Sequence, residues 1–142
     1  MVFLSSMGRI LALDYGIKRT GIAVTDELQI IASGLTTVST PELLDYLSEY
    51  VENENVELIV VGLPKQMNYE DSDSEFLIAT FLVELSEKLP HIPVQRVDER
   101  FTSKMAFKTM IDSGLSKKKR RNKALVDQIS ATLILQTYLN SK

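Results

Sequence analysis

The chain has 142 residues and a net charge of −3; 44% of its residues are hydrophobic and 25% are charged, as in an ordinary globular domain. It has no cysteine and one histidine, which excludes disulfides, zinc–thiolate sites and multi-histidine metal sites. No segment approaches the roughly 20 apolar residues of a membrane-spanning helix, and the N-terminus lacks the basic region of a signal peptide. We therefore expect a cytoplasmic protein that makes no membrane contact.

Three apolar segments in the first part of the chain predict strands. They cover residues 9–14, 21–25 and 30–38, and the glycines at 16 and 21 bracket a predicted turn. Because these segments follow one another closely, we expect them to form an antiparallel meander.

The rest of the chain alternates between helical and strand patterns. In chain order it predicts a helix that starts with Thr40 as N-cap and reaches Val51, a strand over 58–62, a loop over 65–73, a helix over 76–85, a strand over 93–98, a helix between Thr102 and Gly114, and a helix over 123–140. This order predicts an α/β fold whose mixed five-stranded sheet has three antiparallel strands, then parallel ones, flanked by helices. We expect one domain over residues 8–142, preceded by an extension over residues 1–7.

Acidic residues stand at two predicted strand ends and on one helix face. Asp14 ends the first strand, Asp98 and Glu99 end the last one, and Asp127 lies on an otherwise apolar face of the final helix. Each has a simpler explanation: a turn for Asp14, a solvated charge cluster at 98–99, and a salt bridge to Lys123 for Asp127. Together they indicate one acidic site, where a pair of like charges about 4 Å apart repels by roughly 4 kcal/mol. A divalent cation would relieve that repulsion.

A basic segment directly precedes the final helix. Six of the seven residues from 117 to 123 are basic: Lys117, Lys118, Lys119, Arg120, Arg121 and Lys123. Such a run is usually a solvated face, but its position between two predicted helices and beside Asp127 favours binding to nucleic-acid phosphates. A basic segment next to an acidic metal site is the combination that phosphodiester hydrolysis requires.

Four motifs in order make the chain similar to the YqgF family. They occupy residues 14–26, 61–64, 98–103 and 127–136, so the resemblance spans nearly the whole chain, from about residue 8 to 140. It implies a ribonuclease H-like fold related to the Holliday-junction resolvases. The family's members are assigned both as such resolvases and as nucleases for the 5′ end of pre-16S ribosomal RNA.

The same resemblance implies a metal site. Asp14, Glu99 and Asp127 would bind Mg²⁺ or Mn²⁺, and all three, together with Asp98, are candidate catalytic residues. Residues 98 and 99 alternate across a strand, so only one of them should face the site. The residues expected to contact nucleic acid are Lys18, Arg19, Arg100, Lys117, Lys118, Lys119, Arg120, Arg121 and Lys123.

We therefore predict a metal-dependent nuclease that processes the 5′ end of pre-16S rRNA, with pre-rRNA and the ribosome or its precursors as partners. The alternatives are a Holliday junction resolvase acting on branched DNA and a non-catalytic RNA- or ribosome-binding module. A sugar-kinase-type ATPase shares the early Asp-x-Gly pattern, but the chain is too short for its second domain. Residues 65–70 lack the glycine that the family often has after Pro64, so the choice of substrate stays open. The oligomeric state also stays open, because no dimer surface can be recognised.

Overall fold

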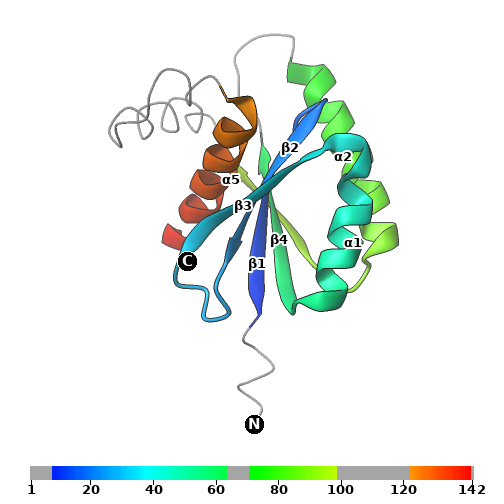
Figure 1. Cartoon of the computed structure of the whole chain (residues 1–142). Coiled ribbons are helices and arrows are strands. Elements are labelled where there is room, and N and C mark those ends of the chain that lie inside the picture. The colour runs from blue at the N-terminus through cyan, green and yellow to red at the C-terminus, as the bar shows by residue number, and fades with distance from the viewer. Residues whose placement is uncertain (1–7, 64–70, 99–121, 142) are drawn as a thin grey trace.

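A computed structural model of the protein describes residues 8–63, 71–98 and 122–141. Its strands are β1 (Arg9–Asp14), β2 (Arg19–Thr25), β3 (Ala32–Ser39), β4 (Val56–Leu63) and β5 (Val94–Asp98). Its helices are the short 3₁₀ helix η2 (Thr40–Glu42), α1 (Leu43–Asn53), α2 (Asp71–Lys88) and α5 (Lys123–Asn140). The five strands form one sheet in the order β3-β2-β1-β4-β5 (Figure 1).

Strand β1 lies at the centre of this sheet and separates its two halves. It pairs antiparallel with β2, which pairs antiparallel with β3, whereas the pairings of β1 with β4 and of β4 with β5 are parallel. The predicted mixed sheet is thus confirmed. Because parallel strands finish at the same edge of a sheet, β1, β4 and β5 all end there, and α5 begins at that end of the molecule (Figure 1).

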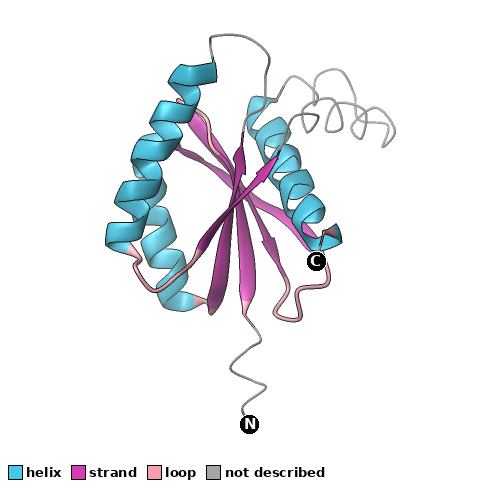
Figure 2. Ribbon diagram, turned by 180° about the vertical axis from the view of Figure 1, so that it is seen from behind, coloured by secondary structure: helices cyan, strands magenta, loops and turns pink. Residues whose placement is uncertain are grey.

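Helices cover both faces of the sheet, α1 and α2 on one side and α5 on the other (Figure 2). Successive side chains of β1 point to opposite faces of the sheet. Leu11 and Leu13 pack in the cluster of α1 and α2, while Ile10 and Ala12 pack in the cluster of α5. Burying each large side chain of this kind stabilises the fold by roughly 1.5–3 kcal/mol. A central strand buried on both faces explains why its sequence is continuously apolar up to Asp14.

Three local predictions were wrong. Strand β2 begins at Arg19 rather than at residue 21, because Arg19 pairs with Ser39 of β3. Helix α2 begins at Asp71, so residues 71–73, predicted as loop, are helical; their acids and serine are typical of a first helical turn. Thr40 does not cap α1, because its hydroxyl donates instead to the carbonyl of Gly16 at 2.6 Å.

Two other predicted segments, the helix over 102–114 and the loop over 65–70, lie outside the described residues. Within the described ranges, none of the helices combines the length and apolarity needed to cross a bilayer.

Candidate functional site

Asp14 is the last residue of the central strand and stands at the edge where the parallel strands finish. It is the register partner of Gly21 on β2. Burial, and to a smaller extent the negative charge of Asp127, raise the pKa of Asp14 from the usual 3.8 to about 7. A carboxyl group in this position is expensive to ionise unless a cation compensates its charge.

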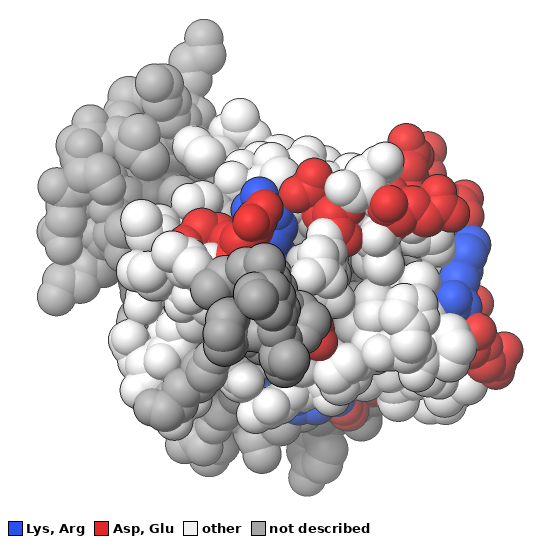
Figure 3. All heavy atoms as spheres, turned by 90° about the horizontal axis from the view of Figure 1, so that it is seen from below, with Lys and Arg blue, Asp and Glu red and all other residues white. Residues whose placement is uncertain are grey.

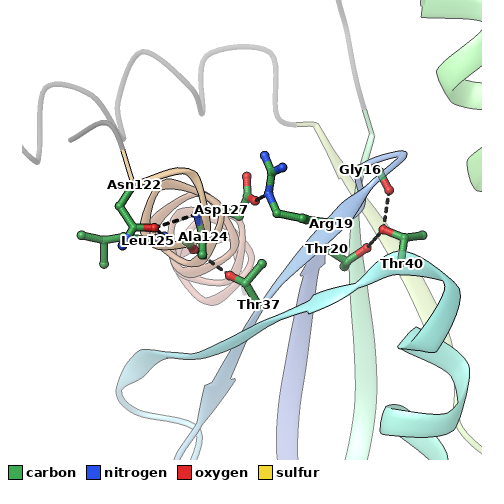
Figure 4. Close-up of polar contacts among 9 residues, drawn as sticks. All are labelled: Gly16, Arg19, Thr20, Thr37, Thr40, Asn122, Ala124, Leu125 and Asp127. Carbon is green, nitrogen blue, oxygen red and sulfur yellow. Dashed lines mark hydrogen bonds and ion pairs between the residues drawn. The ribbon is translucent and has the colours of Figure 1, made fainter. Parts of the chain in front are cut away.

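Asp127 comes to the same place from helix α5, whose first turn is held by two contacts. The side chain of Asn122 accepts hydrogen bonds from the backbone N–H groups of Ala124 and Leu125, at 3.1 and 3.3 Å, and so caps the helix. The hydroxyl of Thr37 on β3 donates to the carbonyl of Ala124 at 2.6 Å (Figure 4). These contacts fix the start of α5 against the sheet and thereby the position of Asp127.

Gly21 allows α5 to approach the sheet closely. A Cβ atom on Gly21 would lie 2.1 Å from the carbonyl oxygen of Asp127 and 2.9 Å from its Cβ. The nearest atoms belong to backbone, which cannot move aside like a flexible side chain, so only glycine fits here. Because Gly21 pairs with Asp14, the contact that requires glycine is also the contact that brings the two acids together.

Arg19 is the cation that accompanies the acid pair. Its Nε donates to Oδ2 of Asp127 at 3.0 Å (Figure 4), and the two side chains are 39% and 20% exposed. Asp127 does form a salt bridge, as its simpler explanation proposed, but its partner is Arg19 of β2 and not the example Lys123 one turn earlier. Arg19 neutralises Asp127 while Asp14 stays protonated over much of the pH range, so the pair is balanced without a metal.

A threonine pair fixes the β1–β2 turn that carries Arg19. Thr20 is fully buried, and its hydroxyl lies 3.0 Å from that of Thr40, which in turn donates to the carbonyl of Gly16 (Figure 4). A Cβ atom on Gly16 would lie 2.4 Å from the carbonyl oxygen of Arg19. The sequence shows the two glycines of this turn, but it gives no signal for two threonines that meet only in the folded chain.

The structure thus brings together Asp14, Arg19 and Asp127 among the predicted site residues. Lys18 is exposed in the same turn, and Lys123 is exposed at the first position of α5. Asp98 ends β5, where it pairs with Leu63 of β4. The remaining predicted residues, Glu99, Arg100, Lys117, Lys118, Lys119, Arg120 and Arg121, lie outside the described residues.

The acid pair fits a hard divalent cation. Carboxylate oxygens are the ligands that such ions prefer, and a bound cation would favour the ionised form of Asp14, whose pKa is raised mainly by burial and to a smaller extent by the charge of Asp127. In the described part of the chain no group of three potential ligand side chains is present. A complete site therefore needs a further ligand from beyond these ranges or from the substrate.

Comparison with known proteins shows which family the chain is similar to. The model of the family described as "RuvX: Holliday junction resolvase" matches residues 8–141. A protein of Christiangramia forsetii named "Putative pre-16S rRNA nuclease" is 65% identical, over 94% of this chain and 98% of the relative. One of the same name from Flavobacterium johnsoniae is 61% identical, over 96% of this chain and 99% of the relative. The solved structure of T. thermophilus RuvC in complex with a Holliday junction substrate matches with a TM-score of 0.59 and 18% identity, over 94% of this chain and 96% of RuvC, and so shows the ribonuclease H-like fold.

The Gly21 contact predicts the effect of one added methyl group. Gly21→Ala should destabilise the protein by about 2–4 kcal/mol, because the new Cβ must push α5 away from β2. Gly34→Ala is the matched control, since its Cβ would meet the flexible side chain of Gln128 at 3.3 Å and should cost less than about 1 kcal/mol. Urea unfolding of both variants measures the difference, and equal losses would contradict the proposed contact.

The raised pKa of Asp14 predicts how stability depends on pH. Since the folded-state pKa of about 7 lies above the usual 3.8, the metal-free protein should lose stability as the pH rises from about 4 to 7. Asp14→Asn removes the charge and should raise the melting temperature at pH 8 by about 2–4 °C for each kcal/mol of penalty removed, with the gain shrinking toward pH 4.

Thermal melts in chelator at both pH values measure this effect. Asp45→Asn serves as the control, because its carboxylate is 84% exposed and its removal should change little. A lower melting temperature for Asp14→Asn at pH 8 would show that Asp14 carries no penalty.

Proposed function

The chain belongs to the RuvX family, also called the YqgF family, and we propose that it is a nuclease whose substrate is the 5′ end of pre-16S rRNA. The observation that carries the proposal is the placement of Asp14 beside Asp127 at the carboxyl edge of a ribonuclease H-like sheet. The RNA substrate is supported by the names of relatives that are 60% identical or more over nearly all of this chain. Its proposed place of action is the cytoplasm, on the precursors of the ribosome.

We propose that Glu99 joins Asp14 and Asp127 as ligands of Mg²⁺ or Mn²⁺. Val97 packs in the cluster of α5, on the side of the sheet that holds Asp127. The period-two alternation of a strand predicts the same side for residue 99, which favours Glu99 over Asp98 as the third ligand. When bound, the cation would supply Lewis acidity, which activates a water molecule and neutralises charge on the leaving oxygen.

The chain's own residues would prepare and orient the substrate. Asp14 must give up its proton before it can act as a ligand, so metal binding should weaken as the pH falls below about 7. Arg19 and Lys18 lie in the turn beside the acids and would hold a phosphate next to the scissile bond. Lys123, Arg100 and the basic residues 117–121 would contact the phosphates farther along the strand.

Cleavage of a four-way DNA junction is the second candidate activity. It is favoured by the description of the matching family and by the junction bound to T. thermophilus RuvC. A resolvase needs two active sites that act symmetrically on one junction. An RNA-trimming enzyme needs only one, so substrate and oligomeric state are linked.

A cleavage assay on two labelled substrates tests the proposal. The wild type should trim a pre-16S 5′ leader RNA with Mg²⁺ or Mn²⁺ but not with chelator. Asp127→Asn should lower the rate by about 10³-fold, which corresponds to roughly 4 kcal/mol of transition-state stabilisation. Asp45→Asn, whose exposed carboxylate lies on α1, should cleave like the wild type.

Each alternative has its own outcome in the same assay. Cleavage of the four-way junction alone would assign the enzyme to recombination. If neither substrate is cut while wild type and Asp127→Asn bind RNA equally, the acids are structural and the chain is a binding module.

A further inference from the structure

The charge of the chain is distributed unevenly along its sequence. Residues 42–88 contain twelve acidic and two basic residues, a net charge of −10, so the remainder of the chain, whose total is −3, carries +7. This acidic stretch includes α1 and α2 (Figure 1), and Asp and Glu side chains gather on the same side in the view from below (Figure 3). Such a face repels nucleic-acid phosphates and attracts a basic partner.

The outward face of α2 carries apolar side chains where a surface helix normally carries polar ones. Phe76 is 71% exposed and Val83 is 58% exposed. Thr80 lies between them, and its hydroxyl donates to the carbonyl of Phe76 at 3.0 Å, so it turns back to the helix. We call Phe76, Thr80, Val83 and Glu87 the outer stripe; their 4-3-4 spacing is that of a helix seam that receives another helix.

A hollow of about 320 Å³ opens beside the outer stripe, between α1, α2 and the β1–β2 turn. Its walls include the apolar Ile17, Pro41 and Leu44, the aromatic pair Tyr15 and Phe81 with ring centroids 5.0 Å apart, and the carboxylate of Glu84. Apolar walls with one carboxylate suit a long cationic side chain, whose stem packs on the walls while its head meets Glu84. The ring of Tyr15 offers a further attraction for such a cation.

We propose that the outer stripe and this hollow form a docking site for a basic amphipathic helix of a partner protein. The partner's apolar residues pack on Phe76 and Val83, and one of its Lys or Arg side chains enters the hollow at Glu84. A second copy of this chain is a poor occupant, because Glu87 of its stripe and the neighbouring Glu84 would lie against like charges. Tyr15 follows Asp14 in the chain but packs in the cluster of α1 and α2, so the docked partner lies on the face of the sheet opposite the acid pair.

This inference rests on the proposed function, because the partner would be a basic protein that is bound to the precursor rRNA substrate. Its test compares binding to small-subunit precursor particles with binding to protein-free leader RNA. The variant Phe76→Ser with Val83→Ser alters the outer stripe. Leu28→Ser with Ile31→Ser is the matched control, since these side chains are 58% and 61% exposed in the β2–β3 connection.

The stripe variant should bind the particles at least about 10-fold more weakly, while its affinity for free RNA and its cleavage of free RNA stay unchanged. The control pair should match the wild type on both ligands. A charge-reversed variant, Glu84→Lys with Glu87→Lys, should also weaken particle binding, whereas Glu27→Lys, whose side chain is 67% exposed, should not.

Several results would overturn the docking site. They are equal losses in the stripe and control variants, no loss in the stripe variant, and a wild type that prefers free RNA to particles. A wild-type dimer in sedimentation that Phe76→Ser dissociates would assign the stripe to a second copy instead. Failure of the wild type to cut leader RNA rejects the proposed function, and that readout is separate from the particle-binding measurement.

Discussion

The site depends on the close contact between helix α5 and strand β2 at Gly21. A methyl group at this position would meet the backbone of Asp127 at 2.1 Å, so the helix reaches its position only over glycine. Gly21 pairs with Asp14 on the central strand, and the same contact therefore places two carboxyl groups from distant parts of the chain side by side. The packing of the core also requires glycine at this position, because α5 supplies the apolar side chains that bury that face of the sheet.

This packing brings together the carboxyl groups of Asp14 and Asp127, although their proximity destabilises the fold. Asp14 is largely buried and its pKa is raised, while Asp127 takes Arg19 as its partner. The metal-free protein thus tolerates the acids by protonating one and pairing the other. A divalent cation would replace both forms of compensation, which is the pattern expected where local destabilisation serves function.

The sheet and its two faces were predictable because their signals are local and periodic. Continuous apolar runs predicted the strands that are covered on both faces, and the predicted strand ends at Asp14 and Asp98 are the ends of β1 and β5. The ion-pair partner of Asp127 was not predictable. Helical spacing indicates only Lys123, one turn earlier, whereas Arg19 belongs to a distant strand. Thr40 was misjudged for the same reason: its hydroxyl has a tertiary partner, the Gly16 carbonyl, which overrides its preference for a helix cap. The choice of Glu99 over Asp98 stays a prediction.

We infer that Asp14 and Asp127 form one cation site on the face of the sheet opposite α1 and α2. Its most direct test is an anomalous-scattering map from crystals grown with Mn²⁺. We expect a peak about 2.0–2.3 Å from an oxygen of both Asp14 and Asp127, with Glu99 as a further ligand. Absence of a peak between these two carboxylates at saturating Mn²⁺, with the Arg19 guanidinium still on Asp127, would contradict it.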